Sequence, residues 1–251
     1  MILRKTLIGM AVLLGGLPVF GQVQSPPAEK YCEGGAVGCF ARTSARYLDP
    51  TSRYPHGVLG DDKEWGSLLV QADDTTNSFK ITLTSEVFED TAPRLADFDG
   101  DGVPEVVAVQ SHPQKGAQLA IYGTDGKRAT TPYIGTRFRW LAPAGIADFD
   151  GDGTLDVAYV DRPHLYKALR VWSYRAGVLA EIATIPDLTN HSIGETEIDG
   201  GLRYCDGRPE MILSDASRTT VVSVYYEAGR FNKDTLGPYS AEAVKSALSR
   251  C

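Results

Sequence analysis

Residues 96–105 read Ala-Asp-Phe-Asp-Gly-Asp-Gly-Val-Pro-Glu, and the pattern returns at residues 147–156 as Ala-Asp-Phe-Asp-Gly-Asp-Gly-Thr-Leu-Asp. Each copy places carboxylates at positions 1, 3, 5 and 9 of a short loop: Asp97, Asp99, Asp101 and Glu105 in the first, and Asp148, Asp150, Asp152 and Asp156 in the second. Like charges this close repel one another, so the arrangement becomes stable mainly when a cation lies among them. The glycine at position 6 lets the backbone turn sharply without a Cβ clash.

The cation that these loops predict is Ca²⁺. It takes six to eight oxygen ligands at about 2.3–2.6 Å, and position 7, which is Val103 or Thr154, adds a backbone carbonyl. The alternative is an Asp-Gly hairpin turn without metal. Four acids in each of two near-identical copies favour the ion, so we predict two calcium sites.

An EF-hand would need a bidentate Glu at position 12 and a helix after the loop. Position 12 is Ala108 in one copy and Tyr159 in the other. The residues that follow, 106–109 and 157–160, are short β-branched and apolar runs, which are typical of strands. The fourth carboxylate therefore comes early, at position 9.

These residues resemble the FG-GAP or VCBS-type repeat, which builds the calcium-bearing blades of integrin-α-like β-propellers. The motif Asp-x-Asp-x-Asp-Gly-x-x-Asp between two strands carries the resemblance, over residues 92–123 and 142–175. Of the Phe-Gly and Gly-Ala-Pro signatures of the integrin form, only Ala-Pro-Ala-Gly at 142–145 is similar. The resemblance implies an all-β fold, a β-propeller, in a repeat protein of the exported bacterial type. Four or five blades would fill the chain after removal of a signal peptide, so we expect a small propeller.

Strand and turn patterns extend this repeat along the chain. We predict units at about 52–85, 86–138, 139–190 and 191–238 within a propeller domain spanning 47–251, and a short helix over 240–249 with Ser240 as its N-cap. Repeats of this period cannot bury both sheet faces alone, so they are expected to stack or to close into a ring.

The last unit is a decayed copy of the motif. Its Asp206-Gly207 aligns with the Asp-Gly at positions 5 and 6, but positions 1 and 3 are Leu202 and Tyr204. We therefore expect no calcium there. Cys205 lies inside this loop, so a disulfide is a candidate to hold the turn that metal holds elsewhere.

The first 21 residues are typical of a signal peptide. Arg4 and Lys5 precede an apolar run from Leu7 to Phe20, which is too short to span a bilayer comfortably, and cleavage before Gln22 fits the small residues ahead of it. An uncleaved anchor is the alternative. We expect a periplasmic or secreted chain that does not span the membrane after cleavage, with an N-terminal tether over residues 22–46.

The four cysteines are Cys32, Cys39, Cys205 and Cys251, and export to an oxidising compartment would pair them. Three pairings are possible, and the sequence alone does not choose. We favour Cys32–Cys39 with Cys205–Cys251, and a zinc site is the alternative.

The net charge and the absence of catalytic motifs argue against several classes of function. The chain has a net charge of −7 and no basic cluster, which argues against nucleic acid and anionic membrane surfaces as partners. None of the four histidines lies in a metal-protease or nucleophile motif, so no catalytic residues are assigned. Polar and aromatic residues between strands form a possible binding surface for a carboxylate or sugar: Arg137, Arg139, Trp140, His164 and His191. The alternative is that these Arg and Trp side chains join adjacent blades.

The favoured function is therefore a binding, adhesion or protein-interaction module, with a protein or a carbohydrate as the open choice of ligand. Two alternatives stay open, because fold does not fix function. One is a periplasmic enzyme with a polar site at the propeller mouth, and the other is a structural scaffold of an envelope complex.

Overall fold

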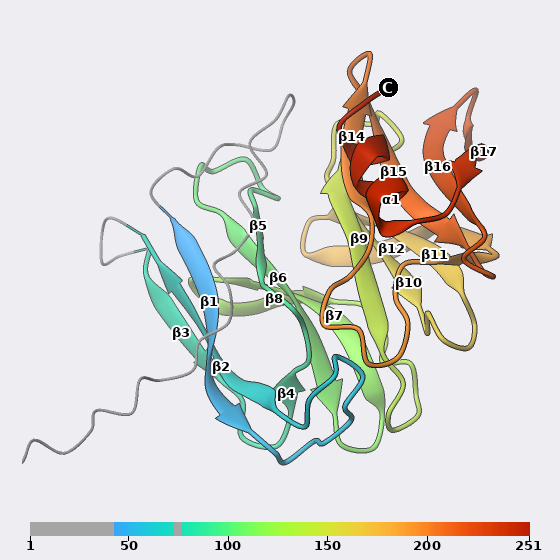
Figure 1. Ribbon diagram of the computed structural model, residues 1–251. Helices are drawn as coiled ribbons and strands as arrows, with labels where there is room; N and C mark the ends of the chain where they lie inside the picture. Colours follow the sequence, from blue (N-terminus) through green and yellow to red (C-terminus); the bar gives the residue numbers. More distant parts are fainter. Residues whose placement is uncertain (1–42, 73–76) are drawn as a thin grey trace, which may run out of the picture.

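The computed structural model describes residues 43–72 and 77–251, which form seventeen strands, one helix and three antiparallel sheets (Figure 1). This arrangement confirms the predicted all-β, propeller-like class with a short C-terminal helix. The predicted signal peptide, most of the predicted tether, Cys32 and Cys39 lie outside the described residues.

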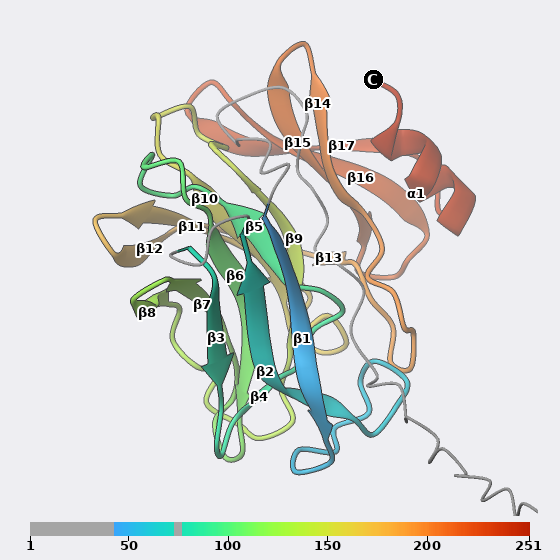
Figure 2. The same cartoon turned by 90° about the vertical axis from the view of Figure 1, so that its left-hand side faces the viewer.

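The first sheet has eight strands and runs in the order β1-β2-β4-β6-β7-β8, with β3 paired to β2 and β5 paired to β6. Figure 2 shows β1, β2 and β6 of this sheet. The strand bounds are β1 Ser44–Thr51, β2 Glu64–Gln71, β3 Phe79–Thr82, β4 Val87–Phe88, β5 Arg94–Ala96, β6 Glu105–His112, β7 Gly116–Gly123 and β8 Gly126–Thr130.

The second sheet has four strands in the order β12-β11-β10-β9, and the third has five in the order β13-β15-β16-β17 with β14 paired to β15. The bounds are β9 Leu141–Ala147, β10 Asp156–Asp161, β11 Ala168–Arg175, β12 Val178–Pro186, β13 Leu188–Thr189, β14 Gly201–Cys205, β15 Arg208–Asp215, β16 Thr220–Glu227 and β17 Arg230–Pro238. The predicted units at 139–190 and 191–238 therefore correspond to separate sheets, except that β13, at the end of the former unit, belongs to the third sheet.

The first two predicted units share one sheet. The two-residue strand β4 joins them, because Trp65 of β2 pairs with Phe88 while Val87 pairs with Ser111 of β6. The start of the domain also differs from the prediction. Strand β1 begins at Ser44, inside the predicted tether, because the alternating residues Ala45 and Tyr47 are buried against β2.

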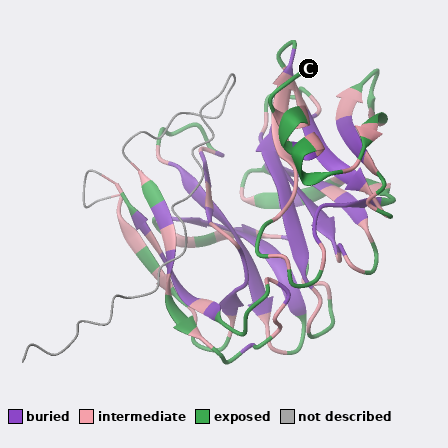
Figure 3. Ribbon diagram, in the orientation of Figure 1, coloured by how far each residue is buried: buried purple, intermediate pink, exposed green. Residues whose placement is uncertain are grey.

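Successive sheets pack face to face, and strand periodicity explains how. In β6, Val106 and Ala108 join the core shared with β1 and β2, while Val107 and Val109 join the core shared with the second sheet. Side chains of a strand alternate between the two faces of its sheet, so a strand that is apolar at every position is buried on both faces. The same alternation in β10 and β15 builds the next cores, and these inner strands are the buried ones in Figure 3.

Helix α1 (Ala241–Leu248) covers the outer face of the last sheet, where its buried Val244 packs on Ile212 and Val221. Ser240 caps the helix, since its side chain accepts a hydrogen bond from the backbone N–H of Ala243 at 3.0 Å. Both features confirm the predicted helix. Among residues 43–72 and 77–251, no buried apolar cluster joins the last sheet to the first. The units therefore stack in chain order, and α1 takes the position of a further blade.

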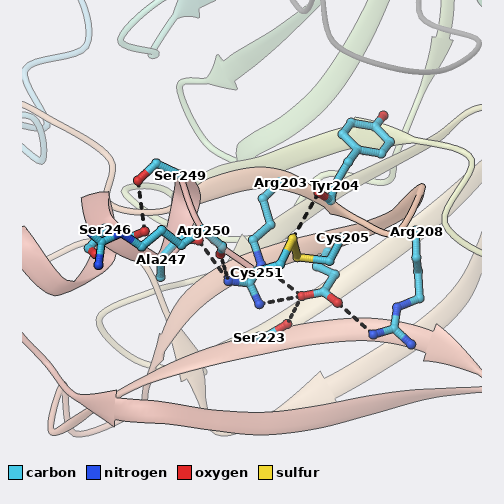
Figure 4. Close-up of a disulfide and its surroundings, with 11 residues drawn as sticks. Arg203, Tyr204, Cys205, Arg208, Ser223, Ser246, Ala247, Ser249, Arg250 and Cys251 are labelled. Atoms are coloured by element: carbon cyan, nitrogen blue, oxygen red, sulfur yellow. Dashed lines mark hydrogen bonds and ion pairs between the residues drawn. A yellow bond between two sulfur atoms is a disulfide. The ribbon is translucent and has the colours of Figure 1, made fainter.

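The Cys205–Cys251 disulfide fastens the C-terminus to the turn after β14, as predicted, with a Cα–Cα distance of 5.5 Å (Figure 4). Arg203 reinforces the same contact. Its guanidinium donates to the backbone carbonyls of Ala247 at 2.9 Å and Arg250 at 2.6 Å. The helix is thus held to the sheet by a covalent bond and by charge-assisted hydrogen bonds as well as by Val244.

No helix in the described part of the chain is long and apolar enough to cross a membrane.

Candidate metal centres and a neighbouring pocket

The two acidic loops have the same backbone design. Asp97 accepts hydrogen bonds from the N–H groups of Gly100 at 2.8 Å and Gly102 at 2.9 Å. Asp148 accepts the equivalent bonds from Gly151 and Gly153 at the same two distances. All four glycines have φ between 75° and 89°, the left-handed region that residues with a Cβ rarely adopt. The side chain of the first aspartate in each loop therefore holds the turn in place by accepting hydrogen bonds from its backbone.

Each loop closes on the carboxylate at position 9, which is the first residue of the following strand. Glu105 accepts from Phe98 N at 2.8 Å, and Asp156 accepts from Phe149 N at 3.0 Å. Both carboxylates are buried, with 1% and 0% of the residue exposed. Burial raises the pKa of each to about 7, against the opposing effect of these backbone hydrogen bonds. Two carboxylates are thus held where solvent does not stabilise their charge.

In each loop three carboxylates offer oxygen atoms within 4.8 Å of one another: Asp97, Asp99 and Glu105 in the first, and Asp148, Asp150 and Asp156 in the second. Hard carboxylate oxygens at this spacing suit a cation such as Ca²⁺. One observation supports the fit directly. Oδ1 of Asp156 is buried and makes no hydrogen bond of ordinary geometry, which is rare for a buried carboxylate oxygen, although an interaction with the Ser173 side chain partly opposes the burial that raises the pKa of this carboxyl.

The remaining predicted ligands lie outside these three-carboxylate groups. Asp101 accepts a hydrogen bond from Val103 N at 2.7 Å, and Asp152 accepts one from Thr154 N at 2.8 Å. Asp152 also forms an ion pair with Arg175. The carboxylates at position 5 therefore fix the turn that carries the position 7 carbonyl.

The two loops differ in their nearest protein cation. Arg128 of β8 reaches the first loop, where Nη1 donates to Asp99 at 2.8 Å and also contacts Glu105. Among the described residues no basic side chain forms an ion pair with Asp148, Asp150 or Asp156. The second loop therefore depends more on an external ion to balance its buried charge.

In the last repeat, arginine side chains neutralise the buried carboxylate at the equivalent position. Glu210 aligns with Glu105 and Asp156, is also buried, and is paired with Arg203 at 2.7 Å and Arg208 at 2.8 Å. Burial alone would raise its pKa, but hydrogen bonds from Arg208, Ser223 and Arg203 hold the pKa of Glu210 below its usual value. The loop itself shrinks to a two-residue turn, Asp206-Gly207, with φ of 53° and 80°. In this repeat the described residues form no group of three acids.

A pocket of about 320 Å³ lies away from the acidic loops, since β10 runs from the second acidic loop at Asp156 to the pocket side at Asp161. It forms where the loop before β2 meets the connections between β8 and β9, β10 and β11, and β13 and β14. Its lining residues are His56, Val58, Phe138, Arg139, Trp140, Arg162, Pro163, His164, Leu165 and Ile193.

Of the predicted binding residues, the structure places Arg139, Trp140 and His164 in the lining. His191 lies behind them, 1% exposed, with its ring edge-on to Trp140 at 4.9 Å. Arg137 covers the ring of Phe138 at 4.3 Å. Trp140 also joins two units, because its Nε1 donates to the carbonyl of Glu89 at 2.8 Å. The structural alternative considered for Trp140 therefore holds alongside its place in the pocket.

His164 in the pocket wall is hydrogen-bonded to His191 behind it. His191 Nε2 must donate to the carbonyl of Glu195 at 2.9 Å, because a carbonyl only accepts. Its Nδ1 then accepts from Nε2 of His164 at 2.9 Å. Burial, followed by the neighbouring histidines, lowers the pKa of His164 to about 4. The pair is therefore neutral at physiological pH.

The pocket lining also contains His56, a histidine that the sequence motifs did not single out. His56 Nδ1 is hydrogen-bonded to Glu89, whose other oxygen accepts from the hydroxyl of Ser111. Glu89 is fully buried, and its burial raises its pKa while the bonds from His56 and Ser111 oppose that rise. The ring of His56 stacks on Phe138 with centroids 5.0 Å apart. This histidine is thus fixed by a buried carboxylate and an aromatic ring.

Glu64, which is 2% exposed, gives a test of the buried acids near Glu89. Burial, with repulsion from Glu89, raises the pKa of Glu64 to about 10. Between its ordinary value and about 10 the folded chain holds a proton that the unfolded chain releases, so stability falls as pH rises through that window. Glu64→Gln should melt higher than the parent chain at pH 8 and close to it at pH 4, as measured by calorimetry. Glu197→Gln, which changes an exposed acid, should leave the pH profile unchanged; an unaltered profile in Glu64→Gln would contradict the assignment.

Comparison with known families matches the FG-GAP-like repeat to residues 97–159, which span both acidic loops and the strands between them. Residues 97–159 thus carry an FG-GAP-like repeat, as the two loops predicted. No curated protein and no solved structure matches the chain. A repeat of this type is typical of a binding or interaction module.

Proposed function

We propose that the protein is an exported binding module whose stacked sheets are stabilised by two calcium ions. The observation that carries the calcium proposal is the second loop, where Asp148, Asp150 and Asp156 converge and Oδ1 of Asp156 makes no hydrogen bond of ordinary geometry. An ion there would coordinate that oxygen and neutralise the buried charge.

Calcium would act on stability through the strands that the loops connect. Each ion would join the end of one strand to the first residue of the next, because Asp148 follows β9 and Asp156 begins β10. Binding to the folded chain alone stabilises it by mass action, by about 2.7 kcal/mol per site at a hundred times Kd. The resulting rigid sheets would present the loops at the pocket end as the binding surface.

A chelator experiment tests this proposal. The melting temperature of the mature chain should fall by several degrees or more on passing from excess calcium to excess EGTA, because about 1 kcal/mol corresponds to roughly 2–4 °C for a chain of this size. Excess magnesium added with the EGTA should restore little of the loss, because Mg²⁺ demands a tighter octahedral geometry and dehydrates reluctantly. A melting temperature that does not change with EGTA would overturn the calcium proposal.

Export is supported by the N-terminal sequence and by the disulfide between Cys205 and Cys251, a bond that forms in oxidising compartments. Expression with and without residues 1–21 in a bacterial host, followed by fractionation, tests it. The full chain should appear in the periplasm or medium shortened by about 21 residues. A full-length chain that stays with the cytoplasm or the inner membrane would contradict export.

A further inference from the structure

We propose that the pocket lined by His56, Arg139 and Trp140 binds a small organic anion with a flat apolar body, held between the Arg139 guanidinium and the aromatic wall. This inference deepens the proposed binding function and rests on it, because it names the ligand class of that module.

The charge of the pocket is opposite to that of the chain. The protein carries a net charge of −7, yet the lining contains two arginines and no carboxylate. Arg162 is paired with Asp161 at 2.8 Å, but among the described residues Arg139 has no acidic partner and only donates to the carbonyl of Phe138 at 2.9 Å. A guanidinium without a counter-ion in a recess favours an anionic ligand.

The rest of the lining is apolar. Phe138 and Trp140 give flat rings, and Leu165 and Ile193 stand at the rim with 63% and 73% of their surface exposed. Exposed large apolar residues beside a recess are typical of a ligand site. A volume of about 320 Å³ accommodates a small molecule and is too small for a folded partner.

The polar groups of the pocket are held in fixed positions before any ligand arrives. Glu89 and Phe138 orient the imidazole of His56, so its Nε2 is the ring nitrogen left for a ligand. Phe138 and Arg162 have φ of 56° and 47°, a strained conformation for residues with a Cβ. The Phe138 strain is supported by a hydrogen bond from its N–H to the hydroxyl of Tyr54 at 2.8 Å. Strain of this kind collects at ligand sites, where it fixes the geometry in advance.

The test uses two probes of the same shape, 2-naphthoate and its neutral amide 2-naphthamide, titrated calorimetrically into the mature chain in excess calcium. We expect naphthoate to bind at one site at least about tenfold more tightly than the amide, since hydrogen bonds to charged groups are the stronger class. Fluorescence of Trp140 should change with the same dissociation constant. Failure of naphthoate to bind, or equal affinity for both probes, would overturn the proposal.

Matched variants locate the site. Arg139→Gln should weaken naphthoate by about tenfold or more and leave the amide unchanged. Ile193→Glu keeps the core intact because Ile193 is 73% exposed, and it should weaken naphthoate through repulsion even if Arg139→Gln folds poorly. Val178→Glu, at an equally open position on β12 outside the pocket, should change neither affinity. If Val178→Glu weakens naphthoate as much as Ile193→Glu does, the pocket is not the site.

The calcium proposal is measured separately on the same samples, by melting with and without EGTA. A normal calcium effect with no naphthoate binding would reject only the anion pocket. Naphthoate binding with no calcium effect would reject only the calcium sites.

Discussion

Asp156→Asn is expected to change the melting temperature in opposite directions with and without calcium. In EGTA at pH 7.5 the variant should melt higher, because it removes a buried carboxylate. Burial raises the pKa of Asp156 to about 7, so the metal-free folded chain loses stability as pH rises from the ordinary value of an aspartate through 7. The neutral amide removes that penalty.

In excess calcium the same variant should melt lower than the parent chain, by roughly 5–10 °C if calcium is near a hundred times Kd. The amide oxygen is needed to accept from Phe149 N at 3.0 Å, so its NH₂ would face the ion. Calorimetry of both proteins in both buffers gives the four values. A variant that melts above the parent chain in both buffers would show that no ion binds at this loop.

Glu210→Gln is the matched control, because Glu210 stands at the equivalent position with two arginines in place of an ion. Removing its charge leaves Arg203 without its carboxylate partner and Arg208 with Glu227 alone, which should lower the melting temperature equally in calcium and in EGTA. A fall in melting temperature that differs between calcium and EGTA in this variant would mean that Glu210 is coupled to the calcium loops and is not an independent control.

Cys251→Ser is expected to have the second large effect. The bond to Cys205 closes a segment with a sequence separation of 46 residues, and on the chain-entropy estimate its removal lowers the free energy of unfolding by about 4 kcal/mol. Helix α1 should separate first, since Val244 is its one buried residue. Denaturant unfolding followed by circular dichroism measures the loss.

A Cys32→Ser/Cys39→Ser double variant provides the control for Cys251→Ser, because it keeps the Cys205–Cys251 bond. Reducing agent should destabilise this double variant and leave Cys251→Ser unchanged. If Cys251→Ser unfolds at the same denaturant concentration as the parent chain, the disulfide contributes nothing to the stability of the fold.

The parts of the fold that local sequence determines were the predictable ones. The acidic loops at 97–105 and 148–156 carry their glycines and carboxylates in one stretch, so their geometry followed from spacing alone. The cap at Ser240 is also a local feature. Where the hydrogen-bonding partners lie only a few positions apart, a single sequence is enough to predict the local structure.

Pairings across long separations were not predictable in this way. The shared first sheet depends on β4, a strand of two residues: Phe88 pairs with Trp65, 23 residues before it, and Val87 pairs with Ser111, 24 residues after it. His56 was missed as a pocket residue because its partner Glu89 is 33 residues away.

The two arginines paired with Glu210 affect how the repeats of such a chain can be counted from its sequence. A repeat that trades its ion for arginine no longer needs the aspartates of its turn, yet it keeps four strands in the same succession. Counting acidic turns therefore gives only a lower limit to the number of sheets. A glutamate near the start of a strand that is paired with two arginines indicates a further repeat, one that a search for the aspartate motif would not find.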